Sequence, residues 1–289
     1  AGLFHRAIME SGACKFLPSK ASAQQQGAKV ATAVGCGTAA DVPACLRALP
    51  AQTLITALPG DPSPLGSSPY QSVIDGSILV EQPADAMAAG RHHAVPILIG
   101  ANADETNAAA PPRMTEDQYE AAIHTQYGTT VGDRVLAQYP ASRFNNSPRA
   151  AYVRATTDSR FVCPARESAR AADAGQTQPV YRYFFQYTGS SPLGAVHGLD
   201  VPYVFGTFNA LTTASGQPYA PTAGDLAVSA AIQGAWASFA RTGTPATTPA
   251  WPSWTPTTDP TMQIDAALSV VNGIRTSDCD FWQPIYNTL

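Results

Sequence analysis

Glu105 and His197 are the two residues whose types and surroundings best suit acid–base chemistry. Each lies in a glycine-flanked loop shortly after an apolar, strand-like run, and open α/β sheets carry their reactive groups on such loops. A carboxylate bonded to one imidazole nitrogen fixes the tautomer and stabilises the cation, so that the other nitrogen can accept a proton from a hydroxyl. The pair therefore predicts two thirds of a catalytic triad.

The serine that would complete such a triad has no recognisable motif. The chain contains no Gly-x-Ser-x-Gly, the strand–turn–helix elbow that exposes an attacking serine, and no glycine run of the kind that forms an oxyanion loop. Such a loop donates backbone N–H groups to the developing oxyanion, and one lost donor raises the barrier by about 3 kcal/mol. We therefore expect these 289 residues to be inactive alone.

Both assignments have a simpler alternative. A carboxylate in a loop such as 102–107 most often caps a turn or faces solvent, and Asp104 is the neighbour most easily confused with Glu105. A lone loop histidine is usually structural or exposed. By type alone, four other histidines are equal candidates: His5, His92, His93 and His124. Only a wider context separates them from His197.

Composition limits the class of protein and its partners. The chain is 45% hydrophobic and 13% charged, which is typical of a globular protein with a large core. Its net charge of −4 argues against nucleic acid or an anionic membrane surface as a partner. No apolar run reaches the roughly 20 residues that span a bilayer. The first residues lack the features of a signal peptide and a starting Met, so we expect any targeting segment to lie upstream.

Secondary structure alternates in the α/β manner. Apolar runs stopped by glycine predict strands over 6–12, 95–100 and 180–187. Helical segments are predicted over 19–34, 115–127, 130–138, 147–173 and 225–241. The last is the clearest, because its apolar residues form one stripe and Gly243 supplies the stop. The Pro-rich segment 245–256 cannot continue a helix and is expected to cross the surface.

Five cysteines admit several interpretations. Cys36 and Cys45 bracket a polar loop that a disulfide would close in an exported chain, and Cys163 with Cys279 would form a long-range staple. Cys14 is then left over. Zinc ligation is the rival interpretation, but no Cys-x-x-Cys or His-x-x-x-His spacing occurs, and free buried thiols would be the default.

Seven short segments together carry a family resemblance. In chain order they are residues 3–8 (LFHRAI), 10–12 (ESG), 100–105 (GANADE), 196–198 (VHG), 202–206 (PYVFG), 239–245 (FARTGTP) and 251–252 (WP). Their types and order resemble the type-B carboxylesterases, the cholinesterase-like branch of the α/β-hydrolases. The resemblance extends over nearly the whole chain.

The resemblance implies a fold and an activity. The fold is the α/β-hydrolase fold, of which residues 1–289 would be the C-terminal portion of a single domain: a mixed, mostly parallel sheet flanked by helices, with the N-terminal part missing. The activity is carboxylic ester hydrolysis through an acyl-enzyme, with Glu105 as the triad acid, His197 as the general base, and no metal or organic cofactor. Ser11 resembles a serine that supports the acid.

The resemblance also implies pairing and location. The family's later disulfides match Cys36 with Cys45 and Cys163 with Cys279, which implies a secreted or otherwise extracytoplasmic protein. The family's nucleophile elbow precedes the LFHRAI motif by roughly one helix. The expected partners are therefore a small ester substrate and the missing N-terminal portion of the same enzyme. Without that portion we expect poor solubility, because a long apolar sheet edge would be exposed.

The alternative is a non-catalytic adhesion or interaction module, since cholinesterase-like folds also serve as binding ectodomains. The presence of both Glu105 and His197 favours the enzyme, because a binding module has no chemical need for either. Ester specificity is not indicated by any of these residues.

Overall fold

The computed structural model describes residues 2–12, 17–58, 70–213 and 215–286. The chain divides into two compact units, Lys15–Pro83 and a larger unit formed by Ala1–Cys14 with Ala84–Leu289. The larger unit contains the whole sheet and both candidate catalytic residues. Cys14, the cysteine that the proposed pairs leave over, lies outside the described residues.

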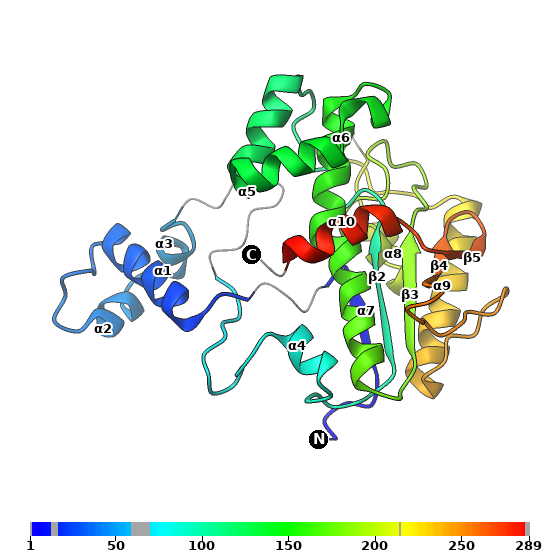
Figure 1. Cartoon of the computed structure of the whole chain (residues 1–289), viewed down its shortest axis with the longest axis horizontal. Coiled ribbons are helices and arrows are strands. Elements are labelled where there is room, and N and C mark those ends of the chain that lie inside the picture. Colours follow the sequence, from blue (N-terminus) through cyan, green and yellow to red (C-terminus); the bar gives the residue numbers. More distant parts are fainter. Residues whose placement is uncertain (1, 13–16, 59–69, 214, 287–289) are drawn as a thin grey trace. The chain divides into compact units, whose positions relative to one another are not determined.

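The larger unit is built on a five-stranded sheet with the spatial order β1-β2-β3-β4-β5 (Figure 1). The strands are β1 (Ala7–Glu10), β2 (Ile97–Asn102), β3 (Val180–Phe185), β4 (Pro260–Ile264) and β5 (Leu268–Asn272). The first four run parallel and β5 returns antiparallel to β4. The predicted mixed, mostly parallel sheet is therefore confirmed, and all three predicted strands are present. The first of them, β1, is half-buried and lies at the edge of the sheet.

Helices cover both faces of this sheet, and the central strand β3 shows how. Successive strand residues point to opposite faces. Tyr181 meets Phe239 and Tyr183 meets Trp236, both on α9 (Ala223–Thr242), with ring centroids 6.1 and 5.3 Å apart. Val180 packs instead into the cluster that contains the alanines of α7 (Cys163–Gly175). A strand buried on both faces needs a continuous apolar run, which explains the strong strand signal of β3.

The helix α7 lies against β2 and β3 and is covered in turn by α10 (Thr276–Tyr286) (Figure 1). Small side chains of α7, among them Ala165 and Ala169, allow close packing on Ile97 and Ile99. The disulfide between Cys163 and Cys279 ties the two helices together, as predicted.

Most predicted helices form, with two refinements. The segments 115–127 and 130–138 join as α5 (Glu116–Gln138), which is interrupted at Gly128, where φ is 71°. The segment 147–173 divides into α6 (Pro148–Thr157), a π-helical turn (Asp158–Val162) and α7. Several elements have no counterpart in the predictions: α2 (Val42–Arg47), α3 (Ala51–Ile55), α4 (Pro83–Ala88), α8 (Asp200–Phe205), α10, β4 and β5.

The segment 245–256 is non-helical and mostly exposed, as predicted for a surface crossing, but two of its side chains anchor it in the core. Trp251 and Trp254 are both buried. The indole N–H of Trp251 donates to the Arg182 carbonyl at 3.2 Å, and that of Trp254 donates to Asp259 at 2.6 Å. Each indole therefore buries a large apolar surface and still finds a hydrogen-bond partner, which favours burial over exposure.

The smaller unit carries α1 (Lys20–Ala33), capped by the Ser19 side chain, together with α2 and α3. The helix predicted over 19–34 is thus confirmed. A disulfide within the smaller unit joins Cys36 to Cys45, also as predicted. Among the residues that the structure describes, none of the helices is both long and apolar enough to cross a bilayer.

Candidate functional site

The loop that carries Glu105, called the acid loop below, begins where β2 ends. The side chain of Glu105 is completely buried there. The Glu105 side chain is 0% exposed and accepts three hydrogen bonds. Its Oε1 accepts from the Ser11 hydroxyl at 2.5 Å and from the Asn102 backbone N–H at 2.7 Å. Its Oε2 lies 2.7 Å from Nδ1 of His197. These hydrogen bonds come from Ser11, Asn102 and His197 and hold the carboxylate fixed in place.

The loop that carries His197, called the base loop below, lies between β3 and α8. Hydrogen bonds that involve backbone groups join it to the acid loop. The His197 N–H donates to the Glu105 carbonyl at 3.1 Å. Asp104 donates its N–H to the Ala195 carbonyl at 3.0 Å, and its carboxylate accepts from the Ala195 N–H at 3.1 Å. Gly198 follows His197 with φ of 78°, a conformation that favours glycine and turns the chain toward α8.

The imidazole of His197 is held on one side and open on the other. Its side chain is 60% exposed. Within the described part of the chain, no residue hydrogen-bonds its Nε2. The Phe161 ring, carried by the π-helical turn, packs against it with centroids 5.0 Å apart. The hydrogen bond from Nδ1 to Glu105 fixes the tautomer that leaves Nε2 as a proton acceptor.

The electrostatic environment raises the pKa of His197 above its ordinary value of 6.5. The hydrogen bond to Glu105 is the largest cause. Partial burial opposes it, and the negative charges of Glu105 and Asp200 add to the increase. The arrangement therefore stabilises the imidazolium that a general base becomes after it accepts a proton.

Residues of the same types that could be mistaken for Glu105 and His197 in the sequence have other partners. Asp104 binds the backbone of Ala195 rather than His197. His92 contacts Gln176 and His124 contacts Asp133, each at 2.8 Å. The structure thus brings together the two residues singled out in the sequence, from positions 92 residues apart.

Ser11 takes the place that the resemblance implied. It follows β1 with φ of 53°, a strained value for a residue with a side chain. Its hydroxyl donates to Glu105 rather than facing Nε2 of His197. This position suits support of the carboxylate and not attack on a substrate.

Sequence reasoning missed a second buried carboxylate, Asp200, which is 2% exposed. Its oxygens accept from the Asn102 side chain at 3.1 Å and from the Tyr183 hydroxyl at 3.0 Å. Glu10 lies in the same region and accepts from the Trp236 indole at 2.6 Å. Burial raises the pKa of Glu10 against the lowering effect of that bond, and Asp200 raises it further. The position of Asp200, only three residues after His197, was the available signal.

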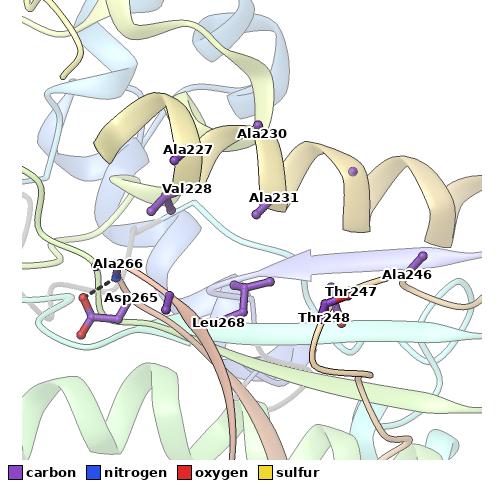
Figure 2. Close-up of a pocket in the computed structure, with 12 residues that line it drawn as sticks. Ala227, Val228, Ala230, Ala231, Ala246, Thr247, Thr248, Asp265, Ala266 and Leu268 are labelled. Carbon is purple, nitrogen blue, oxygen red and sulfur yellow. Dashed lines mark hydrogen bonds between the residues drawn. The ribbon is translucent and has the colours of Figure 1, made fainter. Parts of the chain in front are cut away.

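Two surface hollows are distinct from the acid–base pair. A groove of about 620 Å³ lies between α9 and the β4–β5 hairpin (Figure 2), and neither Glu105 nor His197 lines it. A second hollow of about 550 Å³ is lined in part by Glu10, Phe205 and Trp236. In the ranges that the structure describes, no three His, Cys, Asp or Glu side chains gather in a way that would hold a metal ion.

Comparisons with known proteins agree on one family. The model of the carboxylesterase family matches residues 1–282. Para-nitrobenzyl esterase of Bacillus subtilis (strain 168) is 27% identical over 281 residues, which are 94% of this chain and 55% of that protein. Fumonisin B1 esterase of Sphingopyxis macrogoltabida is 28% identical over 254 residues, which are 84% of this chain and 44% of that protein.

A solved structure titled PNB esterase superposes with a TM-score of 0.80 at 25% identity, covering 98% of this chain and 58% of that one. The fold is accordingly the α/β-hydrolase fold. The chain spans about half the length of the curated relatives it matches. With a family match that extends over nearly all of its residues, the chain belongs to the carboxylesterase family.

Proposed function

We propose that this chain provides the acid and the base of a carboxylic ester hydrolase that works through a Ser-His-Glu triad. The observation that carries the proposal is the fully buried Glu105 carboxylate 2.7 Å from Nδ1 of an imidazole whose Nε2 is open. The relatives support it, since those named above are esterases.

In the proposed reaction Nε2 of His197 accepts the proton of a serine hydroxyl as the serine oxygen attacks the ester carbonyl. The tetrahedral intermediate then expels the alcohol, which takes that proton from His197, and the acyl group stays on the serine. Water repeats the sequence and releases the acid. Glu105 keeps the imidazole in the required tautomer and stabilises the cation in both halves. No metal or organic cofactor takes part.

The attacking serine and the oxyanion donors are proposed to come from polypeptide outside these 289 residues, so that residues 1–289 form the C-terminal portion of one hydrolase domain. The outer edge of β1 supports this proposal. Among the described strands, none pairs with that edge, and Leu3 and Phe4 just before it are exposed. A sheet edge that no described strand covers is a position for a further strand, and exposed apolar side chains beside it give a chain expressed alone a tendency to aggregate.

Both disulfides fit an oxidising compartment, so we propose that the enzyme is secreted or otherwise extracytoplasmic. Its partners would then be a small ester and the N-terminal portion of the same enzyme.

The test is His197→Ala in the full-length enzyme, with hydrolysis of a p-nitrophenyl ester as the assay. We expect turnover to fall by several orders of magnitude while the fold is kept, because the substitution removes the group proposed to accept the serine proton. His93→Ala is the matched control, since His93 is exposed and contacts Phe4 rather than Glu105. Near-normal turnover in His197→Ala would refute the assignment. A full-length protein that hydrolyses no ester and lacks Gly-x-Ser-x-Gly would instead support the binding module.

A further inference from the structure

Asn102 connects the acid loop to the base loop through three bonds. Its backbone N–H donates to Oε1 of Glu105 at 2.7 Å. Its side-chain amide donates to the carbonyl of Val196 at 2.8 Å, immediately before His197, and to Oδ1 of Asp200 at 3.1 Å. The residue is 0% exposed. One buried residue at the end of β2 thus binds the acid with its backbone and the loop that carries the base with its side chain.

The orientation of this amide is determined by its neighbours. The Val196 carbonyl and the Asp200 carboxylate are both acceptors, so only the NH₂ group of Asn102 can satisfy them. No other residue type supplies two donors at that distance from Cα without a charge. A leucine of similar size would leave a buried carbonyl and a buried carboxylate without this donor, and each loss is costly.

Asp200 is itself held by a hydrogen bond from the central strand of the sheet. Its second oxygen, Oδ2, accepts from the Tyr183 hydroxyl of β3 at 3.0 Å. A buried carboxylate costs free energy unless it is well bonded, and here hydrogen bonds reach both oxygens. Asp200 therefore anchors the Asn102 amide, and its carboxylate also contributes to the raised pKa of His197.

We propose that Asn102 and Asp200 are positioning residues of the triad: Asn102 fixes the separation of the acid and base loops, and Asp200 fixes Asn102 and acts electrostatically on His197. The inference rests on the proposed function, because it assigns a role only if Glu105 and His197 are the acid and base. Neither residue touches the ester.

The charged and titratable groups around His197 are few among the described residues. Glu105 binds it from the loop after β2, Asp200 of α8 contributes to its raised pKa through charge, and Phe161 offers only an apolar ring. Tyr183 and Glu10 face Asp200 from β3 and β1. Removal of the Asp200 charge should therefore lower the pKa of His197, because Asp200 contributes to the raised value.

Two variants of the full-length enzyme test the proposal. Asp200→Asn keeps the size and an acceptor for the Asn102 amide but removes the charge. It should move the midpoint of the kcat/KM–pH profile to lower pH. Asn102→Ala removes the side-chain hydrogen bonds to Val196 and Asp200. It should lower kcat by about 10- to 100-fold with little change in KM, because a small misplacement of reacting groups costs about this much in rate. Asp133→Asn, at a carboxylate 64% exposed on α5, is the control for charge removal.

The outcomes separate the two proposals. Folded Asp200→Asn and Asn102→Ala proteins with the kcat and pH profile of Asp133→Asn would overturn the positioning role, provided that His197→Ala is inactive. If kcat and KM change without any movement of the pH midpoint in Asp200→Asn, the role of Asp200 is structural and the proposal fails. If Asn102→Ala does not fold, the midpoint of Asp200→Asn decides alone. If His197→Ala is active, the proposed function itself has failed.

Discussion

The substitution Glu105→Gln isolates the contribution of the carboxylate charge. Glutamine has the size of glutamate, and its oxygen can still accept from Ser11 and from the Asn102 N–H, both of which contact Oε1. Because those two donors require an acceptor, the glutamine NH₂ group must take the place of Oε2, 2.7 Å from Nδ1 of His197. An NH₂ group there can only donate, so Nδ1 must become the acceptor and the ring proton must move to Nε2.

The magnitude of the loss follows from that tautomer. An imidazole protonated at Nε2 cannot accept the serine proton, and the wrong tautomer in a serine triad costs about 10⁴-fold in kcat. This corresponds to a barrier higher by about 5.4 kcal/mol. The pKa of His197 should also fall, because the bond to Glu105 is the largest cause of its increase.

The assay is steady-state hydrolysis of a p-nitrophenyl ester by the full-length enzyme, over a range of pH. Asp104→Asn is the matched control. It removes one carboxylate charge from the adjacent position, and its amide oxygen can still accept from the Ala195 N–H. We expect Asp104→Asn to remain within a few-fold of the unmodified enzyme.

Two results would refute the reasoning. Glu105→Gln with turnover close to that of Asp104→Asn would show that the charge at position 105 is not needed. Equal, large losses in both variants would show that the acid loop as a whole has been disturbed and that the tautomer is not the cause.

Three further predictions concern the pH dependence of activity, the pH dependence of stability and the Cys163–Cys279 disulfide. Because only neutral imidazole accepts a proton, kcat/KM should rise with pH through a midpoint above 6.5, the direction in which the pKa of His197 is shifted; a midpoint below 6.5 would contradict the described environment. The same raised pKa means that the protonated His197–Glu105 pair adds stability that is complete below about pH 6.5 and is lost as pH rises through the folded-state pKa. Replacing Cys163 and Cys279, 116 residues apart, by alanine should lower the free energy of unfolding by about 2–5 kcal/mol in a denaturant titration, and an unchanged value would show that the bond does not form.

The sequence could predict the parts of the fold whose signals are local. The runs that became β2 and β3 are apolar and β-branched or aromatic because both faces of those strands are buried. The stripe of α9 and its stop at Gly243 likewise depend on neighbours within a few residues. By contrast β4 begins at Pro260 and α10 contains Pro284, and proline weakens both signals in a local pattern.

By itself the sequence determined which residue types are available for acid–base chemistry and where the strands β1, β2 and β3 lie, and it offered two possible cysteine pairs. Only the tertiary structure decided that Glu105 and His197 meet, that Arg182 in the middle of a strand is buried against Asp259, and that Asp200 binds Asn102 and Tyr183. The physical reason is that a buried charge is stable only where partners from distant segments converge on it, and such convergence depends on the parallel order of the strands rather than on any local pattern.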